Sequence, residues 1–220
     1  MALSKIDKAF FSDGYNIGLE AVEASLTKES IYSATKQIYE AIDGLIDSLL
    51  KHANREGVSV DCKKGCSMCC YQPVFAVSHE IDFLYNFITH NFAQQKKIEV
   101  LKKAQEVNNR RKNLSNKALY NHKEACPLLE DGNCMAYEAR PMPCRIYLSM
   151  SVDSCRKFYD SPSPDENYAK LLEFPLQAGR MMNEGFTHAL KAAQLNTSEF
   201  RIEEGLVTMQ SKNKNSSSAQ

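Results

Sequence analysis

The spacing of hydrophobic side chains along the chain predicts a mainly helical protein. Between Ser33 and Asn54 apolar residues recur every three or four positions, which is typical of a helix with one buried face. The apolar positions of this segment are Ile38, Ile42, Leu45, Ile46 and Leu49. A second helix is expected to begin at Ser78 as its cap, because a further apolar face follows that serine. That face consists of Ile81, Leu84, Ile88 and Phe92.

Two segments have weaker patterns. Residues 1–30 show little periodicity, and Gly14 and Gly18 are expected to interrupt any early helix. Residues 94–123 predict a long, highly charged helical stretch that is broken near Asn113. Because its apolar positions are sparse, we expect this stretch to lie at the surface or against a partner.

The C-terminal part of the chain carries a further helix signal. Residues Ser163-Pro164-Asp165-Glu166 combine a cap, a first-turn proline and an acidic residue, which is typical of a helix start. This helix is expected to meet Pro175 and then to continue through Met182 and Phe186. Residues 211–220 have almost no apolar content, so we expect a disordered tail there.

These patterns predict one mainly α domain over residues 1–210. A chain of 220 residues is long enough for one well-filled domain. Lysine plus arginine and aspartate plus glutamate are equal at 27 each, so no nucleic-acid partner is expected. No apolar run approaches the roughly 20 residues that cross a bilayer, so no membrane partner is expected either.

The eight cysteines change this picture, because they indicate chemistry beyond a helical scaffold. The N-terminal residues lack the apolar core and cleavage site of a secretory signal, so a cytoplasmic location is expected. Thiols in a reducing compartment favour metal ligation over a disulfide framework. The predicted ligands are Cys62, Cys66, Cys69, Cys70, Cys126, Cys134, Cys144 and Cys155. Residues 62–155 are therefore expected to form a small irregular or β-hairpin cysteine-rich metal module within the helical domain.

Four of these cysteines fall within the nine residues from Cys62 to Cys70. Gly65 precedes Cys66, and its small size would allow the backbone to turn around a metal. Cys69 and Cys70 are neighbours, and adjacent side chains diverge on regular elements. Each is therefore expected to belong to a different centre, or one is a ligand while the other packs or acts as a redox partner.

The other four cysteines follow at wide spacing, beginning with Cys126 and Cys134. Between these two, Asp131-Gly132 predicts a tight turn, and a short hairpin would bring both sulfurs to one end. Pro141 and Pro143 prevent a continuous helix into Cys144.

Together, the two cysteine groups resemble the zinc- or iron-chelating cysteine-cluster family, known from bacteria by its CxxCxxCC motif. The resemblance rests on Cys62-x3-Cys66-x2-Cys69-Cys70, on Cys126-Pro-Leu-Leu, and on Cys134-x2-Tyr137-x2-Arg140-Pro141-x2-Cys144-Arg145. It implies that the eight cysteines bind a metal or an iron–sulfur cluster, and it implies no particular reaction. A related cluster occurs in longer flagellin lysine methylases, so methyl transfer would rest on analogy alone.

Two arginines are candidate cofactor-binding residues. Four thiolates around zinc or an oxidised cubane carry about two net negative charges, which Arg140 and Arg145 could offset while donating hydrogen bonds to sulfur. His122 is expected to be solvated or to cap a helix, and His79 and His90 are expected at the surface.

The functional prediction is a metal-binding protein with a structural, redox or carrier role towards a protein client or redox partner. The cofactor is an iron–sulfur cluster or zinc, and the cluster is favoured because spacings of 7, 9 and 10 residues are too open for a zinc ribbon. The alternative is an oxidoreductase or protein-methylating enzyme with an open cluster position. Cys62-x3-Cys66-x2-Cys69 also has the radical S-adenosylmethionine spacing, but the chain lacks the alternating strand–helix pattern of those enzymes.

Overall fold

The computed structural model describes residues 3–162 and 167–217, and it confirms the mainly α fold. Two compact units are distinguished. Unit 1 comprises Met1–Cys62, Pro141–Val152 and Lys170–Ser198, and unit 2 comprises Lys63–Arg140, Asp153–Ala169 and Glu199–Gln220. The expectation of one domain over residues 1–210 stays a prediction.

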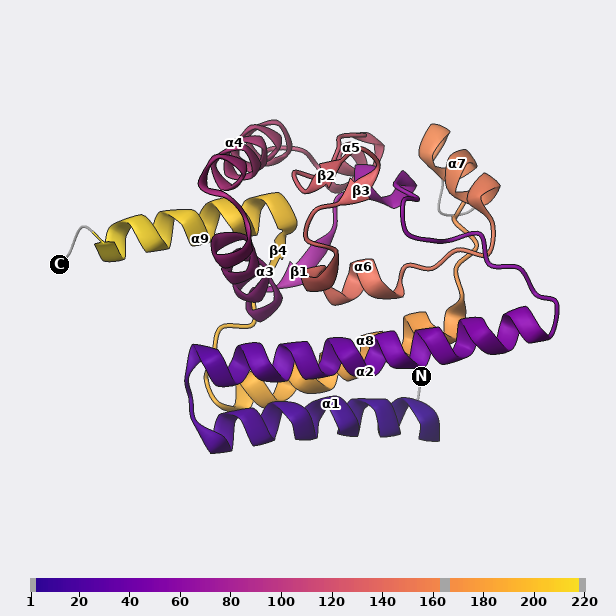
Figure 1. Cartoon of the computed structure of the whole chain (residues 1–220), viewed down its shortest axis with the longest axis horizontal. Coiled ribbons are helices and arrows are strands. Elements are labelled where there is room, and N and C mark those ends of the chain that lie inside the picture. Colours follow the sequence, from indigo (N-terminus) through magenta and orange to yellow (C-terminus); the bar gives the residue numbers. More distant parts are fainter. Residues whose placement is uncertain (1–2, 163–166, 218–220) are drawn as a thin grey trace. The chain divides into compact units, whose positions relative to one another are not determined.

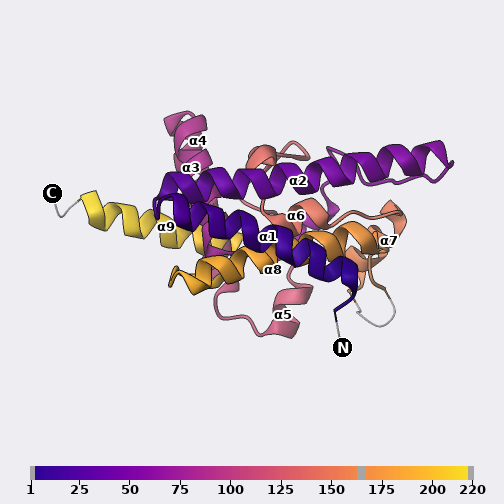
Figure 2. The same cartoon turned by 90° about the horizontal axis from the view of Figure 1, so that it is seen from below.

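Unit 1 is built from long helices that pack along their length. Its elements are α1 (Lys5–Ala24), α2 (Lys28–Arg55), α6 (Met142–Ile146) and α8 (Glu173–Ala192). Helix α8 packs on α1, α2 and α6 (Figures 1 and 2). Helix α2 contains the predicted segment but begins earlier, because the Thr27 side chain accepts a hydrogen bond from the Ser30 amide and caps it. Ile38 and Ile42 of α2 are fully buried, as their spacing predicts.

Helix α1 contradicts the expectation that glycines interrupt the N-terminal segment. It runs unbroken through Gly14 and Gly18, and both glycines are buried. A Cβ atom at Gly14 would lie 1.9 Å from the Met182 carbonyl oxygen, and one at Gly185 would lie 2.0 Å from the Phe11 carbonyl oxygen. The glycines therefore allow the backbones of α1 and α8 to approach more closely than any side chain would permit.

Helix α8 also differs from its prediction. Residues Asn167–Leu172 are not helical, and α8 begins at Glu173. Pro175 therefore lies in the first helical turn, where a missing amide proton costs no intrahelical hydrogen bond, and it does not interrupt the helix. The predicted start at Ser163–Glu166 lies outside the described residues.

Unit 2 contains the shorter elements. These are η1 (Met68–Tyr71), β1 (Phe75–Val77), α3 (Ser78–Asn91), α4 (Gln94–Arg111), α5 (Asn116–Asn121), β2 (Leu129–Glu130), β3 (Asn133–Cys134), η2 (Tyr137–Ala139), α7 (Val152–Asp160, apart from its first residue), β4 (Glu199–Arg201) and α9 (Ile202–Ser217). Helix α9 packs on both α3 and α4. The predicted cap, Ser78, is instead the first residue of α3 and follows the cap Val77.

Helix α4 ends at Arg111 and α5 begins at Asn116, which confirms the predicted break near Asn113. The expected surface position of this stretch is only half right. Ile98 is exposed, whereas Leu101, Ala104, Val107 and Arg111 are buried on the side that faces α9. The apolar positions are few, but they share one helical face, and this is sufficient for packing.

Besides the expected hairpin of β2 and β3, a second small sheet pairs β1 with β4 antiparallel. Its strands are separated by more than a hundred residues, so no local turn signals their pairing. Helix α9 follows β4 directly and continues to Ser217, so the predicted disordered tail is wrong for residues 211–217. Residues 218–220 lie outside the described part.

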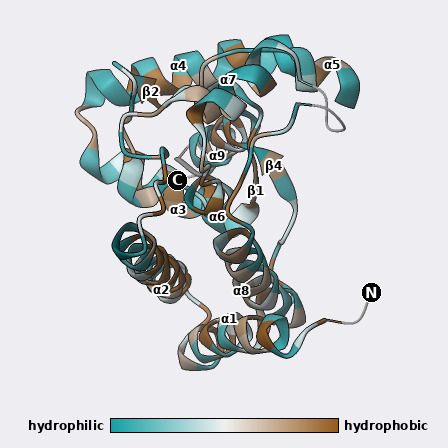
Figure 3. Cartoon of the chain, turned by 90° about the vertical axis from the view of Figure 1, so that its right-hand side faces the viewer, coloured by the Kyte–Doolittle hydropathy of each residue, from teal (hydrophilic) through white to brown (hydrophobic). Residues whose placement is uncertain are grey.

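Helices such as α2 and α4 carry both apolar and polar positions (Figure 3). Within the described residues, no helix is both long enough and apolar enough to span a membrane.

Candidate metal centre

The first cysteine motif in unit 2 is a turn followed by one turn of 3₁₀ helix. The Cys66 amide donates to the Lys63 carbonyl (3.0 Å), and Gly65 between them has φ +92°, a conformation that favours glycine. The Cys70 amide donates to the Ser67 carbonyl (2.9 Å) and so closes the turn of η1. The predicted role of Gly65 in turning the chain is confirmed.

Cys69 and Cys70 do not diverge as the sequence argument assumed. In the tight turn of η1 their thiols interact through a hydrogen bond. That hydrogen bond, together with burial, raises the pKa of the Cys69 thiol far above its usual range, and the positive charge of Arg140 acts in the opposite direction. The two neighbouring sulfurs are thus held close together, within reach of the charge of Arg140.

The second motif is the predicted hairpin. Asp131 and Gly132 both have positive φ, +48° and +74°, as a tight two-residue turn requires. Leu129 pairs with Cys134 across the strands, and its amide also donates to the Cys126 carbonyl (2.9 Å). Cys126 and Cys134 are therefore linked through Leu129, and the charge of one thiolate would raise the pKa of the other.

Two backbone hydrogen bonds join the two motifs of unit 2. The Cys126 amide donates to the Cys70 carbonyl (2.8 Å), and the Glu124 amide donates to the Tyr71 carbonyl (3.2 Å). The tip of the hairpin also lies beside the first motif, because a Cβ atom at Gly132 would be 3.7 Å from the Gly65 carbonyl oxygen. Segments more than fifty residues apart in the sequence are therefore brought into contact.

Helix α7 is the third cysteine-bearing segment of unit 2, and its Cys155 is buried. Cys155 lies one helical turn before Tyr159, so both side chains share a face of α7. The Tyr159 ring packs edge-on against Tyr71, which follows Cys70 directly, at 5.7 Å between centroids. Helix α7 is thus positioned against the end of the first motif.

The two remaining predicted ligands, Cys62 and Cys144, belong to unit 1. The Cys62 amide donates to the Ser149 carbonyl (3.2 Å), and its thiol lies 4.0 Å from the Tyr147 carbonyl oxygen. Cys144 lies in α6, three residues before Tyr147. The eight cysteines are therefore divided between two compact units, and their role as ligands of shared or neighbouring centres stays a prediction.

The two candidate arginines are placed differently. The Arg140 guanidinium lies over the Tyr137 ring, with 3.7 Å from its carbon to the ring centroid, in unit 2 where its charge reaches Cys69. Arg145 is almost fully buried in unit 1, where it forms an ion pair with Asp43 and lies over the Tyr39 ring at 4.0 Å. The contacts of Arg140 suit the predicted role beside sulfur, and those of Arg145 stabilise α6 against α2.

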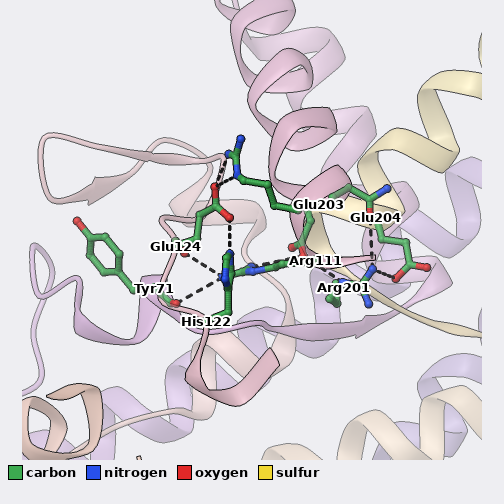
Figure 4. A network of polar contacts seen from close by, with 9 residues as sticks. Tyr71, Arg111, His122, Glu124, Arg201, Glu203 and Glu204 are labelled. Atoms are coloured by element: carbon green, nitrogen blue, oxygen red, sulfur yellow. Dashed lines mark hydrogen bonds and ion pairs between the residues drawn. The ribbon is translucent and has the colours of Figure 1, made fainter. Parts of the chain in front are cut away.

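Arg111 is the most prominent residue that the sequence interpretation missed. Its Nη2 donates to the Glu124 carbonyl (3.0 Å) and the Tyr71 carbonyl (3.5 Å), and its Nη1 lies 3.4 Å from the Glu203 carboxylate (Figure 4). One side chain therefore contacts both cysteine-bearing segments. The available signal was its position on the apolar face of α4, one turn after Val107.

The surroundings of Cys126 are both buried and charged. The residue is half-exposed overall, but its thiol group is enclosed, and this burial raises the thiol pKa to about 12. The negative charges of Cys134 and Glu203 raise the pKa further, whereas the charge of Arg111 lowers it. A metal that binds here would have to displace the thiol proton, so binding would release protons.

Histidines contribute little to this group of cysteines. His122 caps the end of α5 and pairs with Glu124 at 2.9 Å, as its capping interpretation predicts. His90 is exposed, as predicted. The surface prediction for His79 is wrong, because His79 is buried in α3 and its pKa falls to about 3 through burial.

The eight cysteines are present as thiols, and the donors are chemically suited to zinc or iron. Within residues 3–162 and 167–217, however, no three cysteine, histidine or acidic side chains already converge as a metal site. Within unit 2, Cys69 and Cys70 form a close pair, and the other cysteines lie at single positions on segments that contact one another.

Residues 61–169, about half of the chain, match the CxxCxxCC family model, described as "Putative zinc- or iron-chelating domain". This segment belongs to the CxxCxxCC family. The match covers every cysteine of the chain, so metal chelation by a CxxCxxCC domain is the function that the family indicates. Neither the curated proteins nor the solved structures gave a match to the chain.

Proposed function

We propose that this CxxCxxCC protein holds an iron–sulfur cluster through cysteines of unit 2, in a structural, redox or carrier role towards a protein client or redox partner. The observation that carries the proposal is the hydrogen bond between the Cys126 amide and the Cys70 carbonyl. It joins the two cysteine motifs by their backbones, independently of any metal. The cysteines of this unit are Cys66, Cys69, Cys70, Cys126, Cys134 and Cys155.

The choice of a cluster rests on the type and distribution of the donors. These donors are thiols carried on three separate segments, namely residues 66–70, residues 126–134 and helix α7. A cluster core is large enough to be reached from several directions. A zinc ribbon instead favours two short paired knuckles, and here only Cys66-x2-Cys69 has that spacing. The cations Arg140 and Arg111 would offset part of the negative charge of a thiolate-bound centre.

The test is anaerobic purification followed by analysis of iron, zinc and acid-labile sulfide per chain. A brown protein with stoichiometric iron and sulfide is expected, with loss of both in Cys126→Ser. Ser67→Ala is the matched control, since Ser67 lies inside the first motif and its side chain makes no capping hydrogen bond. Colourless protein with stoichiometric zinc and no sulfide would refute the cluster and support zinc chelation.

A further inference from the structure

We propose that Arg111 is a positioning residue that holds the two cysteine segments of unit 2 in register for metal binding. This inference rests on the proposed function, since it concerns how that site is assembled. Arg111 ends α4 and is not part of either cysteine motif. Its role follows from the geometry of its contacts, from its burial and from the contrast with its neighbour Arg110.

The guanidinium of Arg111 is a fork-shaped donor group whose acceptors come from three segments. These are the end of η1, the loop before Cys126 and the start of α9. Nη2 reaches the carbonyl of Tyr71, the residue after Cys70, and the carbonyl of Glu124, two residues before Cys126. The same two residues are joined to each other, because the Glu124 amide donates to the Tyr71 carbonyl. The fork therefore fixes the relative position of the segments whose cysteines are proposed to share a metal.

The burial of this network indicates that its geometry is constrained. The side chains of Arg111 and Glu203 are exposed by only 1% and 2%. A buried charge is costly unless it is paired and hydrogen-bonded, and Glu203 is held in turn by Arg201 Nε at 3.1 Å. Arg201 also donates to Asn108 Oδ1 at 3.2 Å, so Asn108 of α4 and Arg201 of β4 fix the Glu203 carboxylate that pairs with Arg111.

One donor of the Arg111 guanidinium is not used by these contacts. Among the described residues, Arg111 Nε–H is buried and has no hydrogen-bond partner. The Arg111 guanidinium is held on the carbonyl of Glu124, two residues before the proposed ligand Cys126. A donor and a cation in this position are what a metal-bound thiolate requires from its surroundings.

Arg110 is a natural control because it is adjacent but arranged differently. Its side chain is 52% exposed, and Nε donates to the Glu124 side-chain carboxylate at 2.6 Å. It therefore contacts the same segment as Arg111 without touching the backbone that carries the cysteines.

The first measurement is amide hydrogen exchange in the metal-free protein. In Arg111→Met, the Cys126 and Glu124 amides should lose at least about tenfold of their protection relative to helices of unit 1, whereas Arg110→Met should leave them unchanged. Arg111→Lys retains the charge beside Glu203 but has one nitrogen in place of a fork. We expect it to recover part of the global stability without restoring protection at these two amides.

The second measurement is anaerobic Co²⁺ titration, followed by the thiolate-to-metal charge-transfer band. Affinity should fall about 10- to 100-fold in Arg111→Met and in Arg111→Lys, but not in Arg110→Met. Unchanged protection at both amides in Arg111→Met, or full recovery of protection and affinity in Arg111→Lys, would overturn the positioning role. A wild-type chain without the charge-transfer band would show that these thiols do not bind cobalt, and the exchange data would then decide the role of Arg111 alone. The proposed function is tested separately, by the iron and sulfide content of the anaerobically purified protein. If Arg111→Met does not fold, Glu203→Gln and Arg111→Lys provide the same comparison.

Discussion

The close contact between α1 and α8 leads to a sharp prediction for Gly14→Ala. Alanine is the better helix former, by roughly 0.5–1 kcal/mol at an unconstrained position. At Gly14, however, the new Cβ atom would lie 1.9 Å from the Met182 carbonyl oxygen and 2.7 Å from its carbonyl carbon. These are backbone atoms of α8 and cannot rotate away, so the helices must separate locally by about 1 Å.

Overpacking of this kind costs about 1–3 kcal/mol, and a rigid backbone contact belongs at the upper end of that range. After subtracting the gain in helix propensity, we expect Gly14→Ala to lower the free energy of unfolding by about 2 kcal/mol. Gly44→Ala on α2 is the matched control, because a Cβ atom there would meet nothing within 4 Å. It should raise the free energy of unfolding by roughly 0.5–1 kcal/mol.

Urea unfolding followed by far-ultraviolet circular dichroism measures both changes, and amide exchange in α1 and α8 assigns them to unit 1. The same loss is expected for Gly185→Ala, which would place its Cβ atom 2.0 Å from the Phe11 carbonyl oxygen. If Gly14→Ala proves as stable as the wild type, with α1 still protected from exchange, the close helix contact is wrong.

Two further predictions concern buried charge and pH. Burial lowers the pKa of His79 from 6.5 to about 3, so the folded protein keeps this histidine neutral. The neutral form favours folding above pH 6.5, and this contribution to stability is lost as pH falls towards 3. Between about pH 7 and pH 5 the wild type should therefore lose about 2 kcal/mol more unfolding free energy than His79→Leu. Equal losses in the two proteins would contradict the lowered pKa of His79. Asp43→Asn should lower the free energy of unfolding by about 1–3 kcal/mol, because it removes the carboxylate beside buried Arg145. Asp47→Asn, at an exposed position one turn further along α2, should change it by less than about 0.5 kcal/mol, and similar losses in both variants would show that the ion pair contributes little.

Features that depend on neighbouring residues could be predicted from the sequence. The apolar face of α2, the break between α4 and α5, and the turn at Asp131-Gly132 all follow from local spacing or backbone preference, and the structure contains each of them. The cysteine spacing alone also indicates the CxxCxxCC family, and the family match over residues 61–169 confirms this prediction. These signals act within a few residues of the chain, so no knowledge of distant partners is needed.

Other features were decided only by tertiary structure. Gly14 looked like a helix breaker, but its small size is what allows α1 to contact α8. Arg111 looked like one more charge on a surface helix, yet the carbonyls that it binds come from residues 40 and 13 positions away. The pairing of β1 with β4 and the backbone hydrogen bond from Cys126 to Cys70 likewise join residues that are far apart in the sequence. In each case the partner is distant in sequence, and the stabilising contact exists only once the chain has folded.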